Sequence, residues 1–163
     1  MSEKEIALNE EPTKENMDKL IQNHVIGSMG VGLIPLPIVD FVALTWVQLN
    51  MIRKMASAYS IPFSNDKGKN IIGALMGSGV TLPAGYLLAS LCKTIPVIGT
   101  TTGAIAMPAT AGATTYAIGK VFLQHFATGG TLLNLDPEKV KDYYQQMFDE
   151  GKKVSATLQP ATA

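Results

Sequence analysis

The chain has 163 residues, which is enough to bury a substantial core as one domain without a metal ion or a disulfide. Its 13 basic side chains balance 13 acidic ones, so composition excludes a global electrostatic attraction to nucleic acid or to an anionic membrane. The single cysteine, Cys92, excludes an intramolecular disulfide and a multi-cysteine metal site.

Residues 1–12 are predicted to form a flexible acidic N-terminus. They lack the basic start and the apolar core of a secretory signal, so we expect the chain to stay on the side where it is made. Thr13 is a candidate N-cap for a helix from about Lys14 to Leu33, in which apolar side chains recur at three- and four-residue steps. The Ile-Pro-Leu-Pro run that follows predicts a break in the chain.

A second helix is expected from Asp40 to about Tyr59. Asp40 lies just past the prolines and is predicted to cap this helix, with an ion pair to Arg53 or Lys93 in a buried network as the alternative. The helix is apolar on most sides, which indicates a position in the core or at an interface. Trp46 is expected to lie in the core, and an interfacial anchor is its alternative role.

The stretch between Asn70 and Gly119 carries a single charged residue, Lys93. It separates two uncharged segments of about 25 residues, each of which as a helix is long enough to cross a hydrocarbon core of about 30 Å. We therefore expect a central Gly/Ala-rich helical hairpin with a kink at Pro83 and Lys93 at its tip. The prolines, the many hydroxyls and the basic tip keep partial insertion or surface docking open as an alternative to spanning.

Small residues recur at every fourth position in both arms of this hairpin. The first arm reads Gly73, Gly77, Thr81, Gly85 and Ala89, and the second reads Gly99, Gly103, Met107, Ala111, Thr115 and Gly119. This spacing lets helix backbones approach closely, either in lipid or in an oligomer, or alternatively inside one soluble bundle. The predicted helix-contact residues are Gly73, Gly77, Gly85, Gly99, Gly103 and Gly112, and Tyr86 is a further candidate interfacial anchor.

Beyond Gly119 the second arm becomes amphipathic and is expected to end at the Gly129-Gly130 pair. Asp136 followed by Pro137 predicts the start of a final helix that reaches residue 152 or 153. Residues 154–163 are predicted to be a flexible tail, so the single helical domain spans residues 13–153. No segment has the period-two pattern of a strand, and the predicted fold is an all-α helical bundle around the hairpin.

No pattern of catalytic or metal-binding residues stands out. His24 and His125 lie far apart and outside any metal-ligand spacing, so packing or capping roles are expected for both, with ligand binding or pH sensing as the alternative. The sequence contains neither a P-loop nor a G-x-S-x-G nucleophile motif. We therefore expect no enzyme activity, no cofactor and no bound metal ion.

Five segments carry a resemblance to a known family. They are Ile-Pro-Leu-Pro-Ile-Val-Asp-Phe at 34–41, Gln-Leu-Asn-Met-Ile at 48–52, Tyr-Ser-Ile-Pro at 59–62, Thr-Ile-Pro-Val-Ile-Gly at 94–99 and Ala-Thr-Thr-Tyr-Ala-Ile-Gly-Lys-Val-Phe at 113–122. Together they resemble the bacterial domain of unknown function 697 over about residues 20–147. The resemblance implies a membrane-associated helical module that occurs alone or fused behind GTPase domains. It implies no catalytic residues.

These observations predict a non-enzymatic, membrane-associated helical module that self-assembles or acts as an adaptor. The expected partners are a second copy of the chain, membrane lipid and a separately encoded GTPase, and nucleic acid is not expected. Lys67 and Lys69 precede the hairpin and Lys120 follows it, which favours the cytoplasmic side of the bacterial inner membrane. The alternative is a soluble, cytoplasmic homo-oligomer with the glycine-rich hairpin buried between subunits.

Overall fold

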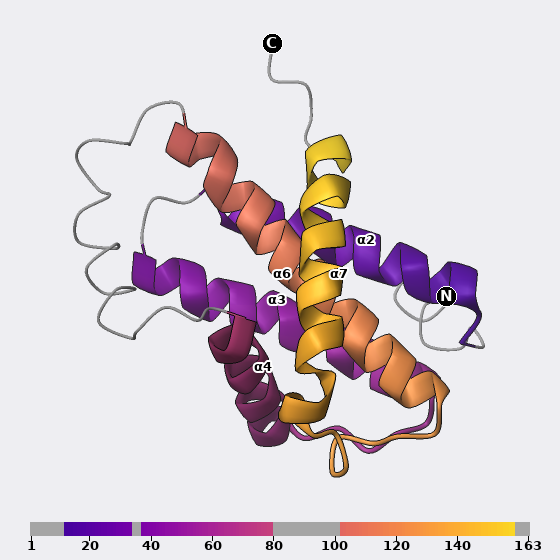
Figure 1. Ribbon diagram of the computed structural model, residues 1–163. Coiled ribbons are helices and arrows are strands. Elements are labelled where there is room, and N and C mark those ends of the chain that lie inside the picture. The colour runs from indigo at the N-terminus through magenta and orange to yellow at the C-terminus, as the bar shows by residue number, and fades with distance from the viewer. Residues whose placement is uncertain (1–11, 34–36, 80–101, 159–163) are drawn as a thin grey trace.

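The computed structural model describes residues 12–33, 37–79 and 102–158. Within these ranges the chain forms five helices and no strand: α2 (Lys14–Val31), α3 (Pro37–Ala58), α4 (Asn65–Gly79), α6 (Thr102–Ala127) and α7 (Pro137–Leu158) (Figure 1). The prediction of an all-α helical bundle is confirmed. The turn of the expected hairpin, with Pro83 and Lys93, lies outside the described residues, so the hairpin stays a prediction.

Helix α6 is the centre of the bundle, because it contacts each of the other four described helices. In Figure 1, α7 crosses in front of α6 and α2 passes behind it. The core is filled mainly by aliphatic, methionine and aromatic side chains, and its largest fully buried members include Phe122, Ile21, Met51, Ile52, Met55 and Ile72. Each such side chain stabilises the fold by roughly 1.5–3 kcal/mol through removal from water. With Tyr144 and Met147 of α7, all five described helices contribute to the core.

Helix α2 agrees with its prediction at both ends. Thr13 is the N-cap, and its side-chain hydroxyl accepts a hydrogen bond from the backbone N–H of Asn16 at 3.2 Å. The helix ends at Val31, close to the expected end. Its buried side chains follow three- and four-residue steps along one face: Met17, Ile21, His24, Val25, Ser28 and Met29.

Helix α3 begins at Pro37, three residues before the predicted start at Asp40. Proline suits the first helical position because its fixed φ matches the helix and its missing N–H would have no partner there. Asp40 is therefore the fourth residue of α3, and its expected place before the first turn is wrong. Arg53 lies 13 residues further along the same helix, about 20 Å along its axis, which is too far for a direct ion pair.

The start of α4 and the end of α6 depend on local chemistry. Helix α4 starts directly after Ser64, whose carbonyl oxygen accepts a hydrogen bond from the N–H of Gly68 at 3.0 Å. Helix α6 continues to Ala127, and Gly129 then adopts a φ of +89°, the left-handed conformation that glycine favours at helix ends. The predicted stop at the glycine pair is confirmed.

Helix α7 extends to Leu158, so the prediction of a flexible tail is wrong for residues 154–158. The cause is a close contact with α6. A Cβ on Gly151 would lie 2.9 Å from the backbone Cα and O of Ala113, so only glycine allows this approach. Ser155, one turn later, is completely buried beside Gly112. The packing of α7 on α6 therefore keeps the last turn helical. The predicted end at residues 152 and 153, which are both lysines, could not include this contact.

Candidate functional site

His24 is engaged in the contact between α2 and α3, with 8% of its surface exposed. Its Nδ1 lies 2.8 Å from the carbonyl oxygen of Leu20, which can only accept, so Nδ1 carries the proton. Nε2 then accepts a hydrogen bond from the amide of Asn50 at 3.4 Å. Burial lowers the pKa of His24 and the nearby charge of Lys54 lowers it further, while the hydrogen bond to Leu20 opposes both. His24 is a packing residue in its neutral form.

His125 holds the connection between α6 and α7. Its Nε2 lies 2.9 Å from the carbonyl oxygen of Thr131 and 2.9 Å from Oδ1 of Asn134. Both histidines thus have the packing and capping contacts that the sequence predicts. Within residues 12–33, 37–79 and 102–158, no group of three or more His, Cys, Asp or Glu side chains is placed to hold a metal ion.

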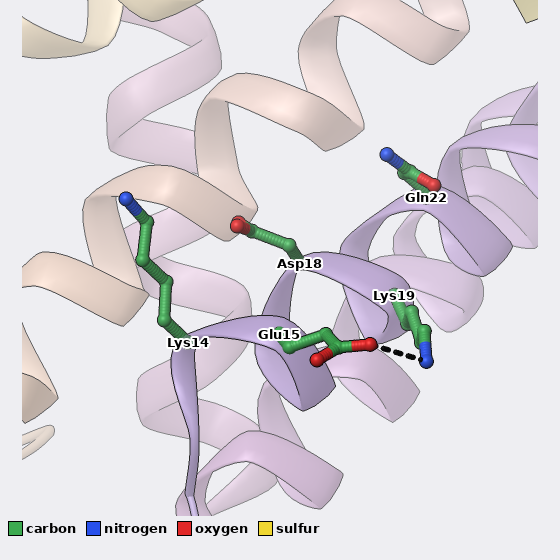
Figure 2. A pocket seen from close by; sticks show the side chains of 5 residues that line it. All are labelled: Lys14, Glu15, Asp18, Lys19 and Gln22. Atoms are coloured by element: carbon green, nitrogen blue, oxygen red, sulfur yellow. Dashed lines mark ion pairs between the residues drawn. The ribbon is translucent and has the colours of Figure 1, made fainter.

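An open depression of about 510 Å³ lies on the first turns of α2, lined by Lys14, Glu15, Asp18, Lys19 and Gln22 (Figure 2). Figure 2 shows Glu15 and Lys19 directed toward one another, at 2.9 Å, with Asp18 pointing away from them. Asp18 pairs with Lys120 of α6 at 2.6 Å. All five lining residues belong to one helix and three of its four charged groups are in ion pairs, so this depression offers little to a ligand.

The predicted contact glycines of the first arm, Gly73 and Gly77, lie on the outer face of α4. A Cβ built on either would meet no atom of the described residues within 4 Å. The inner face of the same helix carries the buried Ile71, Ile72 and Leu75. Helix α4 therefore turns these two glycines away from the described core, whereas Gly68 near its start is buried against Leu49.

The described part of the second arm faces inward. Ala111, Thr115 and Gly119 are all buried on α6. A Cβ on Gly112 would collide with the hydroxyl of Ser155 and lie 2.8 Å from Cγ of Met29. Gly112 thus forms a contact between helices of one chain, α6 with α7 and α2. Gly103 lies in the first turn of α6, while Gly85, Gly99, Tyr86 and Lys93 lie outside the described residues.

A polar junction joins three helices inside the core. Oγ of Ser28 on α2 lies 2.6 Å from Oγ1 of Thr115 on α6, and Nε2 of Gln48 on α3 donates to the same Thr115 oxygen at 3.2 Å. All three side chains are fully buried. The other amide atom of Gln48, Oε1, finds no hydrogen-bond partner among the described residues. The junction fixes how α2, α3 and α6 are rotated against one another.

Trp46 lies on the surface, with 67% of its side chain exposed, so the prediction that it packs in the core is wrong. It borders a cleft between α3 and α4 of about 230 Å³, whose other lining residues are Leu49, Asn50, Arg53, Asn65 and Lys69. Val42, one turn before Trp46, is 64% exposed. This part of α3 thus presents two large apolar side chains beside a basic cleft.

The sequence reasoning missed the burial of Gln48 and the cleft at Trp46. Gln48 precedes the buried Met51 and Ile52 by three and four residues, and this spacing alone places it on the inner face of α3. No comparable signal exists for the cleft. It depends on how α4 is positioned along α3, and local sequence patterns do not contain that information.

Comparison with known proteins agrees with the resemblance. The family described as Domain of unknown function (DUF697) matches residues 4–153. The chain is 37% identical over 142 residues to Magnetosome membrane protein 22 of Magnetospirillum gryphiswaldense, and this match covers 86% of the chain and 73% of that relative. No solved structure matches the chain. Within the described residues, no helix is both long enough and apolar enough to cross a bilayer.

Proposed function

Because this chain belongs to the Domain of unknown function (DUF697) family, we propose that it is a non-enzymatic, membrane-associated helical module that assembles with further copies of itself. The observation that carries the proposal is the outward face of α3, where Trp46 and Val42 are 67% and 64% exposed. Tryptophan is favoured where an apolar environment meets water, as at a membrane surface. The similarity to a protein named as a membrane protein supports the same reading.

The non-enzymatic part of the proposal rests on how the reactive side chains are used. His24 and His125 both make hydrogen bonds within their own chain. The carboxylate of Asp18 is in an ion pair with Lys120. These contacts serve packing and capping, and they leave the surface of the bundle as the functional part of the molecule.

Fractionation of native cells tests membrane association. Membranes are collected at physiological salt and then washed with alkaline carbonate, and the chain is followed by immunoblot. We expect it in the membrane pellet before the wash, where retention after the wash indicates an inserted protein and extraction a peripheral one. Its complete presence in the soluble fraction before the wash would contradict membrane association and favour the soluble homo-oligomer with its glycine-rich hairpin buried between subunits.

Self-assembly is assigned to the outer face of α4, where Gly73 and Gly77 have room for a neighbouring helix. Replacing Gly77 by Leu places a large side chain in that space without touching the core, and we expect the oligomer to become smaller. Molar mass from light scattering, with and without detergent, measures the change. Ala156→Leu, at an exposed position on α7, is the matched control. Equal oligomer size in all three proteins would contradict contact through this face.

A separately encoded GTPase is the adaptor partner within this proposal. Its support is the occurrence of related domains behind GTPase domains, together with a sequence here that lacks a P-loop. Proximity labelling from the full-length chain in native cells should enrich proteins that carry this motif. Labelling that enriches no such protein above a soluble control would remove the GTPase from the proposal.

A further inference from the structure

Two basic side chains line the cleft between α3 and α4, one from each helix. Arg53 comes from the later part of α3 and Lys69 from the second turn of α4, and both line the cleft. The guanidinium of Arg53 donates to Oδ1 of Asn65 at 3.1 Å and lies 5.3 Å from the centre of the Phe63 ring. These two contacts hold the guanidinium in place while leaving several of its N–H donors for a ligand.

The charge of this cleft is not neutralised within the described chain. Lys19, Lys120, Lys139 and Lys152 each pair with a carboxylate, whereas Arg53 and Lys69 form no ion pair with any described residue. The exposed Asp66 in the first turn of α4 is the acidic residue closest in sequence to Lys69, and Lys67 follows it directly. The N-terminus of α4, at Asn65, adds the positive end of a helix dipole. The cleft is therefore suited to an anion.

The apolar neighbours of the cleft indicate the source of that anion. Trp46 lies seven residues before Arg53 on α3, so the two share one helix face about 10 Å apart along the axis. Val42 extends the same face by one further turn. A soluble phosphate would leave both apolar side chains in water. A bilayer surface accommodates the whole face, because indole rings settle at the headgroup level while cations reach the phosphates.

We propose that the cleft formed by Trp46, Arg53 and Lys69 is a docking site for the phosphodiester headgroups of anionic phospholipids at a bilayer surface. This inference rests on the proposed membrane association and assigns the part of the molecule that makes the contact. The net charge of the chain is zero, so attraction to the lipid is local to the α3–α4 face. Increasing salt weakens it, because the screening length falls from about 8 Å at 0.15 M to about 3 Å at 1 M.

The chain contains its own reporter for this contact, because Trp46 is its only tryptophan. The full-length protein is mixed with vesicles of phosphatidylcholine alone, or of phosphatidylcholine with phosphatidylglycerol. We expect the Trp46 emission to shift to the blue, and its quenching by iodide to fall, with the anionic vesicles only. No response to anionic vesicles, or an equal response to both compositions, would overturn the assignment of the cleft.

Charge variants test whether vesicle binding depends on the cations of this cleft or on the total charge of the chain. Replacing both cations, Arg53→Gln with Lys69→Gln, should weaken binding to anionic vesicles about 30-fold, since each basic group near such a surface contributes on the order of a fourfold to sixfold effect. Lys152→Gln with Lys153→Gln removes the same charge from α7 and should leave binding unchanged. Lys69→Glu alone provides a second variant, because Lys69 is exposed and its loss disturbs no described contact. Circular dichroism verifies that each variant is folded.

The remaining outcomes distinguish the two proposals. A wild-type chain that pellets with native membranes, combined with cleft variants that bind vesicles as tightly as wild type, overturns this inference and leaves membrane association standing. Inorganic phosphate that shifts the Trp46 emission without vesicles assigns the site to a soluble anion and overturns the lipid. A shift that follows protein concentration alone assigns the face to a second copy. A chain absent from native membranes contradicts the proposed function itself.

Discussion

The two glycine-rich arms share one sequence pattern and have opposite surroundings. On α6 the small residues are buried, and a Cβ on Gly119 would come within 2.9 Å of Cγ1 of Ile21. On α4 the glycines Gly73 and Gly77 have no other described residue within 4 Å of an added Cβ and face away from the described core. The difference arises because α6 is the central helix, with neighbours around it, whereas α4 buries one face only. The spacing of small residues thus indicates that another helix can approach closely. The position of the helix in the bundle determines whether that neighbour belongs to the same chain.

The largest expected effect comes from filling the closest inward contact. Gly151→Ala places a Cβ against the backbone of Ala113, which cannot rotate away. We expect the free energy of unfolding to fall by about 3 kcal/mol, the upper part of the range for overpacked cores. Urea unfolding followed by circular dichroism measures it. A variant as stable as wild type would mean that α7 shifts on α6 at little cost, and the contrast between the arms would then be weaker.

The second largest effect is expected at the polar junction, because its Thr115 belongs to the buried row of small residues on α6. Thr115→Val removes the oxygen that Ser28 and Gln48 share, and leaves the buried amide of Gln48 without its partner. We expect a loss of about 2 kcal/mol, since an unpaired buried polar group costs about 1–3 kcal/mol. The triple variant Thr115→Val, Ser28→Ala and Gln48→Met should recover much of this loss. Additive losses across the set would contradict a coupled junction.

A smaller change in the free energy of unfolding, of opposite sign, is expected on the outer face of α4. Gly73→Ala adds a methyl group where no atom of the described helices lies within 4 Å, and it removes the backbone freedom of glycine. The monomer should gain about 0.5–1 kcal/mol of stability. Thermal unfolding in dilute solution, beside Gly151→Ala, checks the sign. A destabilised Gly73→Ala monomer would show that this face is covered within the chain itself, and would remove the contrast between the arms.

The smallest expected effect is a pH dependence at the contact of α2 with α3. Burial lowers the pKa of His24 below its ordinary value of 6.5, so the unfolded chain binds its proton more readily than the folded one. The contribution of His24 to stability is therefore complete above about pH 6.5 and is lost as the pH falls below it toward the lowered pKa. His24→Gln should make the free energy of unfolding less dependent on pH just below pH 6.5. Equal slopes for both proteins would rule this contribution out.

Much of the fold was predictable, because helix ends depend on local chemistry. Thr13 caps α2 through a bond to a residue three positions away, and the left-handed Gly129 ends the turn after α6. The end of α7 was not predictable, because it depends on Gly151 and Ser155 meeting α6 from a distant part of the chain. The start of α3 was missed because Asp40 gave a capping signal that the better placed Pro37 overrides.

The candidate site was less predictable than the fold. A helical wheel places Trp46 and Arg53 on one face of α3, but only the position of α4 brings Lys69 to the same cleft. Likewise, the four-residue pattern identifies Gly77 and Gly119 as equivalent, and only the packed bundle separates the outward glycine from the inward one. Local patterns define faces, and the arrangement of helices determines what each face meets.

The long-range contacts of α6 also determine where it lies in the bundle. Bonds from α2 reach across 87 residues at Thr115 and 102 residues at Lys120, so α6 is fastened to the start of the bundle independently of the chain that connects it to α4. These two contacts hold α6 in its place directly against α2, so the position of the central helix is set by residues of the described bundle.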